Sequence, residues 1–372
     1  MTAKDETRAL LLSICVSGGY QAGFAEDDVE ELGQLAEAAG YDGLIAHVAR
    51  VRRPKAATLL GMGVIETTRR LADRVDAQTI IVGGELTAVQ ERNLEKIWER
   101  PVLDRDGLIL NIFARRATTH ESKLQVELAQ SERQRSRLAG LWTHLERQRG
   151  GIGVRGGPGE KQIEIDRRLL SQKIRVLKGK IRKLDTSGGL ARVRRRKNGV
   201  MTVAIVGYTN AGKTTLFKCL TKSAVSPRGR IFDTLESKAR SVYLSGNKHL
   251  VLSDTVGFIR NLPHELVAGF STTLREAADS DLLLIVADAS RADFEEQRSV
   301  VAETLHNIGA ANVPGIMVIN KIDLQSDVAK RAAFDAANGK MATVSLSCKT
   351  GEGIETLRQM LSAQIPAVDN HV

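Results

Sequence analysis

The chain has 372 residues, of which 42% are apolar, and a formal net charge of +10. At about 100 to 200 residues per domain, this length indicates two or three domains with hydrophobic cores. The three cysteines stand far apart without a CxxC pair, which argues against a disulfide framework and against a zinc site. No segment approaches about 18 uninterrupted apolar residues, so we expect no contact with the membrane interior and a cytoplasmic location.

Residues 1–116 alternate strand-like and helix-like runs. Strands are expected at 10–16, 43–48, 79–82 and 108–113, and helices at 27–39, 64–74 and 88–99. This alternation predicts an N-terminal α/β domain with a mostly parallel sheet. Gly61 and Gly63 precede a helix, and we interpret them as a strand–helix turn. His47 and His120 have no neighbouring ligand residues, so we assign them no metal.

Residues 117–188 carry two apolar stripes at helical spacing. The first runs from Leu124 to Leu145, and the second recurs every three, four or seven residues from Ile163 to Leu184. Between them, six of the ten residues from Gly150 to Gly159 are glycine. The pattern predicts an antiparallel helical hairpin with a basic, glycine-rich tip at 149–161. Such a tip can bring its backbone close to phosphates or bases, and a disordered connection is the simpler alternative.

Positive charge is concentrated after this tip. Residues 160–198 contain 14 Lys and Arg against 4 Asp and Glu, a surplus equal to the net charge of the whole chain. Positive charge of this density favours an RNA partner. The alternative is that these side chains simply form a solvated helix face without a partner. Residues 189–199 are expected to form a basic linker to a last domain at 200–372.

The last domain opens with a phosphate-loop motif. Residues 207–214 read GYTNAGKT, and they follow an apolar run that predicts a strand. Glycines at both ends let backbone N–H groups turn inward around phosphate oxygens, and a helix starting near Lys213 adds its positive dipole end. Lys213 is predicted to reach the β and γ phosphates, and the Thr214 hydroxyl to bind Mg²⁺.

Three later segments select the nucleotide. Asp254-Thr-Val-Gly257 follows a predicted strand, as expected of a carboxylate behind the Mg²⁺ ligands and a glycine N–H near the γ phosphate. In Asn320-Lys-Ile-Asp323, the Asp323 carboxylate can accept two hydrogen bonds from guanine, which adenine cannot donate. Ser347-Cys-Lys349 has the position of a loop that closes over the base. Together these segments predict a GTP-binding G domain.

Thr234 lies about where a switch threonine that senses the γ phosphate is expected, and it is the second predicted Mg²⁺ ligand. Signalling GTPases often have a water-orienting Gln after the last glycine of this motif, whereas this chain has Phe258. A phenyl ring cannot orient water by hydrogen bonding, which predicts slow intrinsic hydrolysis completed by a partner or another group. Asn210 is a candidate for recruiting K⁺, and an ordinary loop residue is the equal alternative.

Longer strings give the chain a resemblance to a known family. They include Asn93-Leu-Glu-Lys96, Trp142-Thr-His-Leu-Glu146, the glycine-rich tip with Pro158-Gly-Glu160, the phosphate loop, and Asp254-Thr-Val-Gly-Phe-Ile259 followed by Leu262-Pro-His264. Over nearly its whole length the chain resembles the HflX family of ribosome-associated GTPases. The resemblance implies a protein that binds the large (50S) ribosomal subunit and its rRNA, splits stalled or idle ribosomes, and hydrolyses GTP faster on the ribosome.

Two other outputs remain open: large-subunit assembly or RNA maturation, and nucleotide-gated RNA binding with little turnover. We expect a monomer that binds GTP or GDP with Mg²⁺ and uses Lys213, Thr234 and Asn210 in catalysis. The predicted nucleotide-binding residues are Gly207, Tyr208, Thr209, Asn210, Ala211, Gly212, Lys213, Thr214, Thr215, Phe232, Asp233, Thr234, Leu235, Glu236, Asp254, Thr255, Val256, Gly257, Asn320, Lys321, Asp323, Ser347, Cys348 and Lys349.

Overall fold

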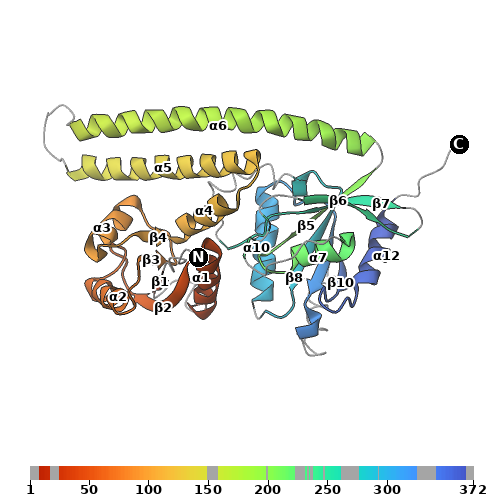
Figure 1. Cartoon of the computed structure of the whole chain (residues 1–372), viewed down its shortest axis with the longest axis horizontal. Helices are drawn as coiled ribbons and strands as arrows, with labels where there is room; N and C mark the ends of the chain where they lie inside the picture. Colours follow the sequence, from red (N-terminus) through yellow and green to blue (C-terminus); the bar gives the residue numbers. More distant parts are fainter. Residues whose placement is uncertain are drawn as a thin grey trace, which may run out of the picture. The chain divides into compact units, whose positions relative to one another are not determined.

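A computed structural model describes most of the chain (Figure 1). The described residues are 8–16, 25–148, 158–197, 200–222, 231–232, 234, 238–245, 248–260, 276–291, 293–324 and 341–365. The structure divides into two compact units, Met1–Ile181 and Arg182–Val372. None of the helices in the described part of the chain combines the length and the hydropathy needed to cross a bilayer.

The first unit contains a four-stranded parallel sheet in the order β2-β1-β3-β4. The strands are β1 (Arg8–Val16), β2 (Asp42–Val51), β3 (Thr79–Val82) and β4 (Val102–Asp104), and the helices between them are α1 (Ala25–Ala39), α2 (Met62–Arg74) and α3 (Ala88–Trp98). Every residue of β3 is buried, as expected for an inner strand of a parallel sheet. The predicted α/β class is confirmed.

The strand predicted at 108–113 is wrong, because these residues belong to helix α4 (Arg105–Arg116). The strand of this region is the short β4, and its last residue, Asp104, caps α4 by accepting a hydrogen bond from the Gly107 N–H at 2.8 Å. Five apolar residues of α4 are buried, including Leu108 and Phe113. A run this uniformly apolar is compatible with a buried helix as well as with a strand, so periodicity alone could not separate them.

Two long helices follow, α5 (His120–Gln148) and α6 (Pro158–Lys197), and Figure 1 shows them antiparallel. Within the first unit, Ile174, Leu177 and Ile181 of α6 are buried, which accounts for the apolar stripe read from the sequence. Two ion pairs join the helices, from Lys173 to Glu127 and from Lys178 to Glu132, both at 2.8 Å.

Helix α6 begins before and ends after the apolar stripe at 163–184 from which it was predicted. It continues through residues 189–197, where we expected a linker, so the basic segment is helical. Arginine and lysine are good helix formers, and a long helix absorbs the cost of about 1 kcal/mol for each interior glycine. Pro158 to Lys161 also belong to α6 rather than to the predicted tip, because proline is tolerated in a first helical turn. The rest of the tip, 149–157, lies outside the described residues.

The second unit contains a six-stranded sheet in the order β10-β9-β8-β5-β7-β6, in which only β6 is antiparallel to its neighbour. The strands are β5 (Met201–Gly207), β6 (Lys238–Tyr243), β7 (His249–Asp254), β8 (Leu282–Asp288), β9 (Gly315–Asn320) and β10 (Ala342–Ser345). The described helices are α7 (Lys213–Thr221), α10 (Phe294–Asn307), η1 (Ile322–Leu324) and α12 (Ile354–Gln364). The polar loops described below leave the carboxyl ends of the parallel strands.

Candidate functional site

The phosphate loop joins the end of β5 to the start of α7. Gly207 and Gly212 adopt φ angles of +149° and +98°, which the motif required. A Cβ atom on Gly212 would lie 2.2 Å from Nδ2 of Asn320, so only glycine fits there. The loop therefore holds the backbone turn that precedes α7, whose N-terminal N–H groups are suited to bind an anion.

Lys213 is buried inside this loop. Its Nζ donates a hydrogen bond to the carbonyl oxygen of Tyr208 at 2.7 Å. Burial lowers the pKa of Lys213 to about 8, against the opposing effect of the nearby Asp254 carboxylate. A buried amine of this kind gains most from an anionic partner, because the anion replaces the lost hydration of the ammonium.

Three oxygen-bearing side chains converge beside Lys213. Thr214 Oγ1 and Thr234 Oγ1 lie 2.8 Å apart, and they donate to Oδ2 of Asp254 at 2.9 and 2.7 Å. Burial raises the pKa of Asp254, although both hydroxyl hydrogen bonds favour its charged form. The other oxygen, Oδ1, is buried and has no hydrogen-bond partner in the described structure. A cluster of hard oxygen donors with an unsatisfied carboxylate fits Mg²⁺.

On the other side of the loop, Asn320 links three segments. Its Nδ2 donates to the carbonyl oxygen of Ala211 at 2.9 Å, and its Oδ1 accepts from the Cys348 N–H at 3.1 Å. Nearby, the hydroxyl of the buried Ser347 donates to Oδ1 of Asp323 at 2.6 Å. This hydrogen bond lowers the pKa of Asp323, which favours a charged carboxylate that can accept from a base.

The sequence reasoning missed Asp288. It is the last residue of β8, and its Oδ2 pairs with Nζ of Lys321 at 2.6 Å. Lys321 adopts φ of +64°, so the ion pair fixes an unusual backbone turn directly before Asp323. A carboxylate ending an otherwise apolar strand, as in Leu-Leu-Leu-Ile-Val-Ala-Asp, was the signal that could have revealed it.

Phe258 faces the protein core rather than an open site. Its side chain is 1% exposed, and its backbone N–H and C=O pair with Gly207 O at 3.0 Å and Thr209 N at 2.7 Å. A Phe258→Ala substitution would leave a core cavity, at a cost of about 3 to 5 kcal/mol. That substitution therefore cannot isolate hydrolysis from folding, and slow intrinsic turnover stays a prediction.

The remaining predicted residues are distributed around these groups. Tyr208, Thr209, Ala211, Phe232, Thr255 and Val256 are buried, Thr215 is half-buried, and Asn210 is exposed with φ of +62°. Gly257 lies so close to Lys213 that an added Cβ would be 2.8 Å from Nζ, and the Lys349 N–H donates to Ser347 Oγ at 3.3 Å. Asp233, Leu235 and Glu236 lie outside the described residues.

Three protein-family models match consecutive parts of the chain. "GTP-binding GTPase N-terminal" matches residues 26–114, "GTP-binding GTPase Middle Region" matches 116–195, and "50S ribosome-binding GTPase" matches 202–321. A solved structure titled as the SsGBP and GDP complex is 22% identical, with a TM-score of 0.52, and covers 96% of this chain and 98% of that one. At this identity the likeness shows the fold.

Curated relatives match over most of the chain. "GTPase HflX" of Magnetococcus marinus is 42% identical over 88% of this chain and 76% of its own length. "GTPase HflX" of Escherichia coli K12 is 42% identical over 91% of this chain and 79% of its own length. Because both alignments span the two units described above, the chain belongs to the HflX family of GTPases.

Proposed function

We propose that this GTPase binds GTP at the phosphate loop and hydrolyses it to GDP and phosphate while bound to the large ribosomal subunit. The buried Lys213 supports the first part, because within the described part of the chain its ammonium donates to the carbonyl oxygen of Tyr208, which it would exchange for β and γ phosphate oxygens. Asp323, held by Ser347, would accept from the guanine edge, and Asn320 would keep the base loop beside the phosphate loop.

Mg²⁺ would be held by the hydroxyls of Thr214 and Thr234, with Asp254 behind them. When bound, this ion would neutralise phosphate charge and polarise the phosphoryl group. Thr234 would also couple its segment to the γ phosphate, because its hydroxyl already lies within the oxygen cluster. Asn210 is exposed at the loop surface, a position from which it could help to hold K⁺.

The burial of Phe258 supports the proposal that a partner completes the catalytic site. Phe258 follows the Asp-Thr-Val-Gly motif, and its side chain is buried in the core while its backbone is hydrogen-bonded. It therefore offers the attacking water no hydrogen bond. A ribosome would then supply or order the missing group. The match of residues 202–321 to the family model "50S ribosome-binding GTPase" supports the ribosome as this partner.

Splitting of ribosomes into subunits is the proposed output, with the protein acting as a cytoplasmic monomer. The hairpin of α5 and α6 would contact rRNA through its basic side chains, since Arg167, Arg175 and Lys178 are exposed. The domain division we propose remains 1–116, 117–188, 189–199 and 200–372, although α6 crosses the second boundary and includes residues 158–161 of the tip predicted at 149–161.

The test measures phosphate release in potassium buffer with and without purified 70S ribosomes, and sucrose-gradient profiles of ribosomes incubated with protein and a non-hydrolysable GTP analogue. We expect faster release and conversion of 70S particles to subunits. Binding to large subunits without conversion would support assembly or RNA maturation instead. If neither turnover nor sedimentation changed, the ribosomal proposal would fail. A parallel series in sodium buffer tests K⁺.

A further inference from the structure

Helix α6 carries a second apolar stripe that the hairpin core does not use. Ile165, Leu169 and Val176 are 52%, 58% and 52% exposed. They lie four and seven residues apart, so they share one helix face, while Ile174 and Leu177 are buried on another. Single exposed aliphatic residues are ordinary, but three aligned on one helix mark a surface suited to contact another molecule.

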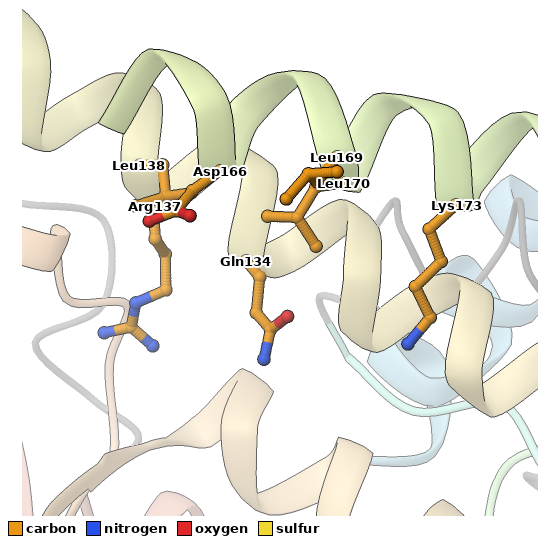
Figure 2. Close-up of a pocket in the computed structure, with 7 residues that line it drawn as sticks. All are labelled: Gln134, Arg137, Leu138, Asp166, Leu169, Leu170 and Lys173. Atoms are coloured by element: carbon orange, nitrogen blue, oxygen red, sulfur yellow. The ribbon is translucent and has the colours of Figure 1, made fainter. Parts of the chain in front are cut away.

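The stripe borders a groove of about 510 Å³ between α5 and α6. Its lining includes Leu138 of α5 and Leu169 and Leu170 of α6. Figure 2 shows Gln134 of α5 and Lys173 of α6 pointing to the same side of the helix pair. Leu169 belongs to both the aliphatic stripe and the groove lining, so the two adjoin at this residue, and together we call them the α5–α6 groove.

Among the described residues, four cations lie around this groove, and two of them are ion-paired within the protein. Arg137 pairs with Glu91 of α3, and Lys173 pairs with Glu127 of α5, so these two contribute little net positive charge. Along α6, Arg168 and Lys180 are exposed, and helical geometry places them on either side of the aliphatic stripe. Asp166 is the acidic residue among the described groove residues. An apolar floor between the exposed cations Arg168 and Lys180 favours an apolar ligand with negative flanks.

We propose that the α5–α6 groove binds an amphipathic helix of another protein, with its apolar residues on the floor and acidic residues on its flanks. In helix-in-groove recognition the bound helix lays residues i, i+3, i+4 and i+7 into an apolar groove. A second copy of this chain fits poorly, because a symmetric contact would bring two basic α6 faces together. RNA would meet the basic flanks but presents mainly phosphate and sugar, which gain little from burying three aliphatic side chains.

The probe is a fluorescein-labelled synthetic helix of about three heptads, with leucine at the a and d positions and glutamate on both flanks. Fluorescence anisotropy measures its binding to the full chain. The test variant is Leu169→Asn with Val176→Asn, which changes exposed residues and is expected to leave folding intact. We expect affinity to fall about tenfold or more, because two aliphatic contacts are lost. Ser171→Asn, an exposed change elsewhere on α6, is the matched control and should bind as the parent does.

Two further binding experiments distinguish an acidic helix from a basic helix and from RNA. A peptide with the same leucines but lysine in place of glutamate should bind much more weakly, and Arg168→Glu should partly restore it. Equal binding of both peptides, or unchanged binding by the double variant, would overturn the proposal. A labelled RNA hairpin should bind the parent and the double variant equally. If the double variant lost binding to the RNA but kept binding to the peptide, the groove would be an RNA-binding surface and the protein partner would be excluded.

Discussion

Each of the two units has an aspartate at the carboxyl end of a parallel strand, but the two carboxylates have different hydrogen-bond and ion-pair partners. In the first unit, Asp104 at the end of β4 pairs with the Arg133 guanidinium and caps α4 through the Gly107 N–H. In the second unit, Asp254 at the end of β7 meets two threonine hydroxyls, and its Oδ1 has no partner among the described residues.

This difference separates a structural carboxylate from one available for a ligand. A carboxylate neutralised by a cation of the same protein has its charge and hydrogen bonds satisfied before any ligand arrives. Burial raises the pKa of Asp254, although the two hydroxyls and the nearby Lys213 favour its charged form. Its Oδ1 still has no partner among the described residues, which leaves that oxygen available to a cation. Position at a strand end is therefore not sufficient to predict a binding site, since the partners of both carboxylate oxygens decide its use.

The strongest way to break this comparison is to remove the cation of the second unit. Lys213→Ala should lower kcat for GTP by about 100- to 1000-fold, because a preorganised donor to the phosphates is lost. Single-turnover phosphate release measures the effect. Lys218→Ala, on the same helix α7, is the control and should stay near the parent rate. A Lys213→Ala protein with normal turnover would show that the loop lysine has no catalytic role.

The base side of the same unit gives the next largest effect. Asp323→Asn should weaken GTP binding by about 10- to 100-fold, because hydrogen bonds to a charged acceptor are lost. The amide can instead donate to a carbonyl at the base C2 position, so xanthosine triphosphate should now bind better than GTP. Titration with labelled nucleotides measures both. Glu352→Gln is a nearby exposed control, and equal losses for both nucleotides would argue against base recognition by Asp323.

In the first unit, removing the cation should destabilise the fold without lowering GTP turnover. Arg133→Gln leaves the buried Asp104 carboxylate without its partner, at an expected cost of about 3 kcal/mol. Hydrogen exchange by mass spectrometry should show faster exchange in α4 and α5. GTP turnover by the chain alone should stay unchanged. Arg135→Gln on the same helix is the control. A fall in turnover equal to that of Lys213→Ala would contradict the separation of roles.

The smallest effect concerns Asp106, whose pKa burial raises to about 6, with further repulsion from Asp104 and Glu85. The folded state binds the Asp106 proton more tightly than the unfolded state does. The stability that this proton contributes is therefore fully present below about pH 4 and is lost as the pH rises through 6. Asp106→Asn should therefore stabilise the protein by about 1 kcal/mol at pH 7, a value reduced for partial exposure. Urea unfolding of the parent and the variant at pH 5 and 7.5 measures this difference. A variant less stable than the parent at pH 7.5 would contradict the prediction.

Sequence reasoning succeeded where a motif fixed both chemistry and backbone. The φ angles of Gly207 and Gly212 follow from the phosphate-loop spacing, because that spacing works with one backbone path. It failed at 108–113, where apolar residues are buried on a helix instead of a strand, and at 189–197, where helix formers override the glycine pair Gly188-Gly189. The packing of Phe258 and the ion pair of Asp288 depend on contacts distant in sequence, which periodicity does not encode.

The bridging amide of Asn320 makes the site a single cooperative element. One side chain ties the phosphate loop at Ala211 to the base loop at Cys348, so neither loop can loosen without disturbing the other. The amide proton of Cys348 is consequently a local reporter. Its exchange with solvent deuterium requires the bridge to open, and any nucleotide that clamps both loops should slow that exchange together with that of the phosphate-loop amides.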